Sequence, residues 1–216
     1  MTSILMFLLN KGKQMVVVGD TQHTYQYSTK EESKLELFGK LLFCASGYDK
    51  IIWWIYPEIN NLRVTTSCSK KILKLTQEKK EEFSRIGTSS SFTADDIDSC
   101  EFMIINSENL KANIISHGLT NGTKNVELIG SGNPHIGEVQ QMLGRIYEFP
   151  FGPHLFKKIV EIYGFLGRND AHTGHPAIFN LEVFLLEKSK SPQRFRISFK
   201  PDITDYDNYE VKSENA

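Results

Sequence analysis

The order of apolar patterns along the chain is the feature that most constrains its fold. Strand-like runs come first, a helical stretch follows, three more strand-like runs come next, and two helical stripes precede two final strand-like runs. A fold of repeated βαβ units would need strict alternation of strands and helices, which is absent here. Two sheets between two helical layers accommodate the order. We therefore predict an α+β fold, a four-layer αββα sandwich.

The strands are predicted from short apolar runs bounded by turn residues. Residues 3–9 and 15–18 are apolar, and the polar turn between them predicts a β-hairpin at the start of the chain. The second run ends at Gly19-Asp20. Further strands are predicted over residues 35–44, 101–106, 112–117, 126–129, 177–186 and 195–199.

The helices are predicted from apolar residues three and four positions apart. Ile136, Val139, Leu143 and Ile146 form one buried stripe, and a second runs from Leu155 to Leu166. Residues 67–86 are rich in Lys, Glu and Leu and predict a mostly exposed helix. Residues 48–58 fit either a helix or a strand.

Length and charge limit the classes of protein to be considered. A chain of 216 residues favours one domain, which we assign to residues 1–200, followed by a polar, acidic tail over residues 201–216. A formal net charge of −1 gives no field for nucleic acid or an anionic membrane. No stretch approaches the roughly 20 apolar residues of a membrane span. Three cysteines suit a reducing cytosol better than a disulfide framework.

Thr2 carries the chemistry that is most specific in this sequence. Removal of Met1, which a small second residue permits, would make Thr2 the amino terminus. Its hydroxyl could then attack a carbonyl, and its α-amine could take the proton because such amines titrate near ~8. On its own the residue is equally compatible with the plain start of a strand, since many proteins begin Met-Thr.

Four further segments follow Thr2 in a characteristic order. They are Gly19-Asp20-Thr21-Gln22-His23-Thr24, the stretch from Lys34 to Ala45-Ser46-Gly47, Gly130-Ser131-Gly132 before a predicted helix, and Asp170-Ala171-His172-Thr173-Gly174 before a predicted strand. This set resembles the proteasome β-subunit family of N-terminal nucleophile hydrolases, over roughly residues 2–188. It is most similar to the bacterial proteasome-like peptidase that works with a ring ATPase.

The resemblance implies a threonine peptidase with Thr2 as its nucleophile. Asp20 corresponds to the family's buried acid, and Lys34 to the lysine that lowers the pKa of the terminal amine. The N–H of Gly47 would stabilise the oxyanion. Lys34 fits the family spacing only if one residue is missing before Ala45; otherwise Ser33 takes its place and the lysine is lost.

The remaining segments imply groups around the amine and the substrate. Ser131 and Asp170 correspond to a pair that hydrogen-bonds around the amine, and Thr173 stands where the family usually has serine. Thr21 and Thr24 correspond to positions that pair with the substrate backbone as an added strand. His23 and Ala45 are expected in the specificity pocket.

The resemblance also implies partners: unfolded polypeptide as substrate, self-association into a ring, and an ATPase unfoldase. No cofactor is expected, although the family's loop near Asp170 can hold a cation. Asp170, His172 and His175 have the spacing Asp-x-His-x-x-His, but a tight loop is a better interpretation than a zinc site. Two alternatives stay open: an inactive ring subunit, and an amidase or transpeptidase with the same N-terminal chemistry on another substrate.

Overall fold

The structure is a computed structural model. It describes residues 3–25, 28–31, 33–47, 52, 71, 74–75, 78, 81–82, 99–116, 119–121, 125–170, 173, 178–200 and 208–214, with the backbone alone for 22–25, 28–31, 116 and 119–121.

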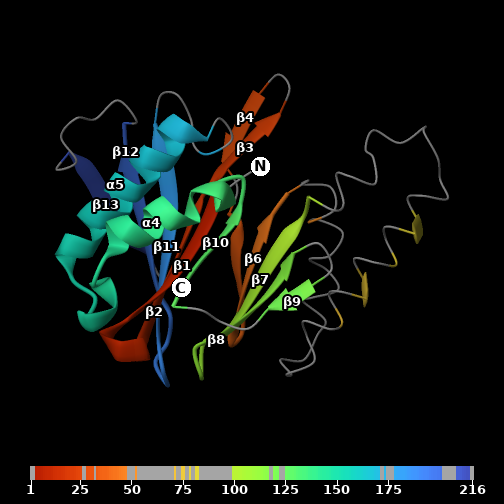
Figure 1. Cartoon of the computed structure of the whole chain (residues 1–216), viewed down its shortest axis with the longest axis horizontal. Coiled ribbons are helices and arrows are strands. Elements are labelled where there is room, and N and C mark those ends of the chain that lie inside the picture. The colour runs from red at the N-terminus through yellow and green to blue at the C-terminus, as the bar shows by residue number, and fades with distance from the viewer. Residues whose placement is uncertain are drawn as a thin grey trace.

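Two antiparallel sheets lie face to face in a mixed α/β fold (Figure 1). The six-stranded sheet has the order β10-β1-β2-β11-β12-β13, the five-stranded sheet has the order β5-β6-β7-β8-β9, and β3 and β4 form a separate hairpin. The strands are β1 (Ser3–Leu9), β2 (Gln14–Asp20), β3 (Gln22–Tyr25), β4 (Ser28–Glu31), β5 (Leu35–Phe38), β6 (Leu41–Ser46), β7 (Glu101–Asn106), β8 (Lys111–Ser116), β9 (Leu119–Asn121), β10 (Val126–Gly130), β11 (Phe179–Glu187), β12 (Gln193–Phe199) and β13 (Tyr209–Glu214).

Helices cover the outer face of the six-stranded sheet (Figure 1). They are α4 (Ile136–Leu143) and α5 (Pro153–Asn169), with short 3-10 helices at η1 (Asn10–Gly12), η2 (Asn133–His135) and η3 (Ile146–Glu148). Both predicted stripes face this sheet. The first is shorter than predicted, because α4 ends at Leu143 and Gly144 adopts a φ of 54°. Ile146 therefore lies in η3 rather than in α4.

Alternation along the central strands builds two cores. In β1, Leu5 and Phe7 pack with the helices, whereas Ile4 and Met6 pack between the two sheets. Since both faces of β1 are covered, a nearly continuous apolar run is what this strand requires. The same alternation in β2 and β11 fixes which side chains face the second sheet.

Two predictions are corrected by the structure. The single strand predicted over residues 35–44 is the hairpin β5–β6, whose register leaves Gly39 and Lys40 as a two-residue turn with a φ of 60° at Gly39. The tail predicted over residues 201–216 contains β13, which pairs with β12 from Phe199–Tyr209 to Arg194–Glu214. Alternating Glu and Lys made this strand look like a solvated tail.

Most of residues 48–98 lies outside the described residues, including the ambiguous stretch at 48–58 and most of the predicted helix at 67–86. Those that are described between 71 and 82 are helical and mostly exposed. The described helices offer no segment of the length and apolarity that crossing a membrane would need.

Candidate active site

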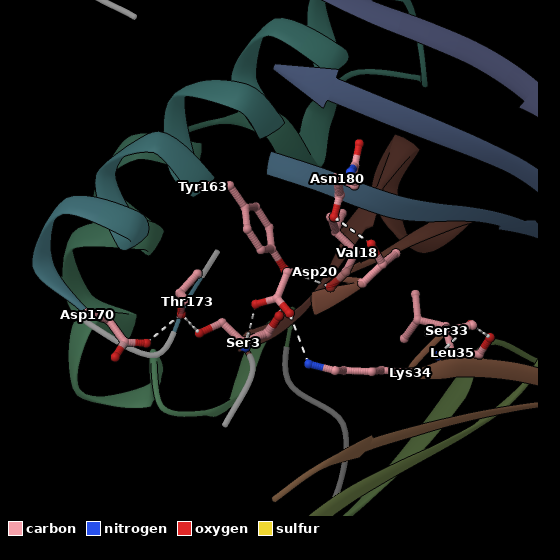
Figure 2. Close-up of polar contacts among 11 residues, drawn as sticks. Ser3, Val18, Asp20, Ser33, Lys34, Leu35, Tyr163, Asp170, Thr173 and Asn180 are labelled. Atoms are coloured by element: carbon pink, nitrogen blue, oxygen red, sulfur yellow. Dashed lines mark hydrogen bonds and ion pairs between the residues drawn. The ribbon is translucent and has the colours of Figure 1, made fainter. Parts of the chain in front are cut away.

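A buried ion pair joins the two sheets at one end of the molecule (Figure 2). Asp20 is the last residue of β2, and Lys34 directly precedes β5; their side chains are 1% and 7% exposed. Lys34 Nζ donates to Asp20 Oδ1 at 3.1 Å. Burying a charged side chain costs free energy unless an opposite charge lies in contact with it. The position of each of these two side chains is therefore tightly determined by the other.

The structure places Lys34, and not Ser33, against Asp20. The Lys34 carbonyl accepts the N–H of Ala45 at 3.2 Å, which extends the β5–β6 pairing by one step. Ser33 lies outside the pair: its hydroxyl contacts Glu182 Oε2 at 2.5 Å and the Leu35 carbonyl at 2.7 Å. Of the two residues considered for the family's lysine position, Lys34 is the one whose side chain contacts Asp20.

Ser3 connects this ion pair to the loop after α5. Its N–H, part of the peptide bond that joins Thr2 to Ser3, donates to Asp20 Oδ2 at 3.3 Å. The Ser3 hydroxyl lies 2.5 Å from that of Thr173, which in turn donates to Asp170 Oδ2 (Figure 2). Thr2 itself lies outside the described residues.

Tyr163 holds the first strand from the helix side, a role that the sequence did not reveal. Its buried hydroxyl lies 3.0 Å from the Ser3 carbonyl and 2.8 Å from the Val18 carbonyl, joining β1 and β2 at the site. Burial, with a contribution from the charge of Asp20, raises the pKa of Tyr163 well above its usual value. The phenol is thus a neutral donor. The sequence offered one signal for this role, a tyrosine within the apolar stripe of a predicted helix. A tyrosine hydroxyl that is buried usually forms a hydrogen bond, so this position suggested a buried polar contact.

The loop after β10 lies against the start of β1. A Cβ on Gly132 would overlap the Ser3 hydroxyl and come within 3.3 Å of Leu166, so only glycine fits here. The neighbouring Ser131 Oγ is shielded from solvent and has no hydrogen-bond partner within the described part of the chain. A buried hydroxyl without a hydrogen bond costs free energy. Ser131 is therefore a group of this site that would be stabilised by an additional hydrogen-bond partner.

Gly47 follows β6 in a backbone conformation that favours glycine. Its φ is 129°, and a Cβ there would lie 2.7 Å from both Cα and Sγ of Cys100. Ala45, predicted in the specificity pocket, is fully buried in β6. Burial raises the pKa of the neighbouring Cys44 thiol, so Cys44 is an inert core side chain and not a nucleophile.

The predicted substrate-binding segment begins at the end of β2. Thr21 donates both its N–H and its hydroxyl to the Asn180 carbonyl, at 3.0 and 3.2 Å. His23 and Thr24 belong to β3, which pairs with β4, but their side chains lie outside the described residues. His172 and His175 also lie outside them, and the described residues contain no cluster of His, Cys, Asp or Glu that could hold a metal ion.

A second buried carboxylate lies on the inter-sheet face of β11. Glu182 is 1% exposed; it accepts the Ser33 hydroxyl and forms an ion pair with Arg194. Arg194 also pairs with Glu214 of β13 at 3.3 Å. Burial raises the pKa of Glu182, and the Ser33 hydrogen bond and the Arg194 charge oppose that rise. The pair of β11 and β12 is thereby tied to the segment that carries Lys34.

Replacing Glu182 by glutamine should give a stability difference that grows with pH. A carboxyl whose pKa is raised on folding contributes stability below its unfolded pKa, and this is lost as pH rises through the folded value. Glutamine cannot ionise, so the unfolding free energy of Glu182→Gln minus that of the wild type should increase between about pH 4 and 7. Urea titrations across this range measure it.

Glu148→Gln provides a control of opposite sign. In the wild type, the hydrogen bond that Arg145 donates to Glu148 lowers the pKa of the Glu148 carboxyl. The wild type therefore gains stability as pH rises, and the variant does not. If the unfolding free energy of Glu182→Gln minus that of the wild type stays constant or falls as pH rises, the raised pKa assigned to Glu182 is contradicted.

Among known proteins, the chain is similar to solved structures but not to known sequences or family models. No family model and no curated protein sequence matches the chain. Anbu, an ancestral beta-subunit, from Yersinia bercovieri matches with a TM-score of 0.63 and 15% identity over 89% of this chain and 86% of that one. Anbu from Pseudomonas aeruginosa, solved as a helical assembly, gives 0.63 and 13% over 95% and 90%. Thiobacillus denitrificans BPH in complex with epoxomicin gives 0.60 and 12% over 88% and 100%. The chain therefore has the proteasome-like fold of Anbu and BPH.

Proposed function

We propose that the chain is a threonine endopeptidase of proteasome type, with Thr2 as nucleophile after removal of Met1. The observation that carries this proposal is the buried Lys34–Asp20 ion pair, in which Asp20 also accepts the N–H of the Thr2–Ser3 peptide bond. A trans peptide sets Thr2 Cα only about 3.8 Å from Ser3 Cα. The terminal amine would thus be tethered close to a fixed cation.

That cation gives the amine its chemistry. A cationic lysine disfavours the ammonium form of a neighbouring amine and so lowers the pKa of that amine toward neutral pH. Ser131 supports the same assignment, because its buried hydroxyl would gain the partner that the described residues do not provide. Thr173 contacts the Ser3 hydroxyl and donates to Asp170, which holds the Ser3 side chain in place.

The proposed reaction is an acyl transfer to Thr2 followed by hydrolysis. The Thr2 hydroxyl attacks the substrate carbonyl while the amine takes its proton, and the Gly47 N–H stabilises the oxyanion. The amine then passes the proton to the leaving nitrogen, which leaves an ester on Thr2. Water then attacks the ester while the amine takes a proton from it. The acyl–oxygen bond to Thr2 breaks, the carboxylic acid leaves, and the amine returns the proton to the Thr2 oxygen. No cofactor is required for any of these steps.

The substrate would be an unfolded polypeptide that adds a strand beside β3. We assign the main-chain pairing with substrate to Thr21 and Thr24, with His23 and Ala45 at the specificity pocket. We further propose self-association with a closed chamber, a helical layer that completes a four-layer sandwich, and an ATPase that delivers substrate. The helical assembly of the Pseudomonas aeruginosa Anbu supports self-association.

Intact-mass spectrometry with epoxomicin as the electrophile tests the proposal. We expect loss of Met1 and one adduct, which peptide mapping locates on Thr2 and which Thr2→Ala eliminates. Met1 retained with no adduct would instead indicate an inactive ring subunit. An adduct without turnover of a fluorogenic peptide panel, but with turnover in the presence of amine acceptors, would indicate an amidase or transpeptidase.

A further inference from the structure

Glu101 is a buried carboxylate that the proposed chemistry does not use. It is the first residue of β7 and is 7% exposed. It has the same strand parity as Met103 and Ile105, which pack between the sheets, so it occupies a position where an apolar side chain would be expected. Burying a carboxylate there costs free energy unless its contacts compensate, and those contacts are therefore informative.

The first contact reaches across to the other sheet. Glu101 Oε2 accepts the N–H of Gly130 at 2.5 Å. Gly130 ends β10, an edge strand of the six-stranded sheet, and directly precedes Ser131. The carboxylate thus takes the place of a neighbouring strand at that edge.

The second contact is made by the backbone of Glu101 and of the residue before it. In the β6–β7 pairing Glu101 is opposite Ser46, the residue before Gly47. Cys100, the residue before Glu101, lies so close to Gly47 that a Cβ there would be 2.7 Å from the Cys100 backbone. The dipeptide Cys100–Glu101 therefore touches both the Gly47 turn and the loop that carries Ser131.

We propose that Glu101 is a positioning residue that fixes the Gly47 turn relative to the Gly130–Ser131 loop. This inference rests on the proposed function, in which Gly47 contacts the oxyanion and Ser131 contacts the amine. The two groups come from different sheets, and Glu101 is a direct link between those sheets beside the site. Its loss would let the two loops shift separately, and a displacement of about 1 Å can cost about a hundredfold in rate.

Three substitutions at Glu101 separate positioning from simple packing. Glu101→Gln keeps an acceptor oxygen at the same reach and should retain kcat within about threefold. Glu101→Met keeps the length but removes the acceptor, and Glu101→Asp keeps the charge but shortens the reach. Both should lower kcat by about tenfold to a hundredfold and change KM by less than about threefold.

Ser107→Ala is the matched control, because it breaks a hydrogen bond at the other end of β7, where the Ser107 hydroxyl donates to the Lys40 carbonyl at 3.0 Å. It should lower stability and leave kcat unchanged. If Glu101→Met does not fold, Glu101→Asp decides the question. A kcat within twofold of the wild type in the folded variant overturns the proposal, as does an equal loss of kcat in Glu101→Gln.

Hydrogen exchange distinguishes this failure from failure of the proposed function. Glu101→Asp should accelerate exchange in peptides spanning both 41–47 and 126–132, whereas Glu101→Gln and Ser107→Ala should not do so. Acceleration in neither peptide, or in 126–132 alone, overturns the link between the loops. A wild type that forms no Thr2 adduct refutes the peptidase assignment, and the exchange result still tests Glu101.

Discussion

A Thr2→Ala variant should lose peptide cleavage by more than about 10⁴-fold and keep its fold. The substitution removes the attacking hydroxyl, and loss of the nucleophile alone removes most of the rate enhancement in a covalent mechanism. The fold should persist because the group that Asp20 binds at this point is the main-chain N–H of Ser3, which alanine at position 2 leaves in place. Fluorogenic peptide turnover and thermal unfolding give the two readouts.

Thr2→Ser is the control for that experiment. It keeps both a hydroxyl and a terminal amine, and should therefore retain measurable turnover and the epoxomicin adduct. Unchanged cleavage in Thr2→Ala would refute the assignment of Thr2 as nucleophile.

The second large effect is expected from breaking the Lys34–Asp20 pair. Lys34→Met leaves the Asp20 carboxylate buried without its lysine, and Asp20→Asn leaves the lysine buried without its carboxylate. Removing one partner of a buried ion pair typically costs about 3–5 kcal/mol. Each single variant should therefore unfold at much lower urea concentration and show no peptide turnover, because the cation that lowers the amine pKa is absent or misplaced.

The double variant Asp20→Asn with Lys34→Met separates stability from chemistry. With neither charge buried, most of the lost unfolding free energy should return, but turnover should not. Lys40→Met removes the exposed ion pair between Lys40, in the β5–β6 turn, and Glu108, which follows β7, and should change neither property appreciably. Turnover near the wild-type level in the double variant would contradict the role assigned to the ion pair.

Local patterns predicted much of the architecture. Apolar runs located β1 and β7, and spacing of three and four located α4 and α5, because these signals depend only on neighbouring residues. The β5–β6 hairpin was missed because a Gly-Lys turn carries little signal between apolar residues. The strand β13 was missed because most of its side chains are exposed, and it is held by pairing with β12 and by the ion pair of Glu214 with Arg194.

Candidate site residues could be predicted where their role depends on residue type. They could not be predicted where their role depends on hydrogen bonds to residues far away in the sequence. The resemblance to the proteasome β-subunit family implied Asp20 and Lys34, and the structure places their side chains in contact. The contributions of Ser3, Tyr163 and Glu101 came from hydrogen bonds between elements far apart in sequence. A single sequence gives no information on which serine, tyrosine or glutamate will make such a contact.

The strand order of the six-stranded sheet also governs when the site can exist during synthesis. β1 is synthesised before both of its neighbours, β2 and β10, and β2 pairs in turn with β11. Ser3 and Thr173 are 170 residues apart in the chain, and Asp20 lies opposite Leu181. Contacts of such sequence separation form late because the loop between them must close first. Under the proposed mechanism, a nascent chain would carry the Thr2 hydroxyl long before the surroundings that activate it have formed, so the nucleophile would stay inactive until the domain is complete.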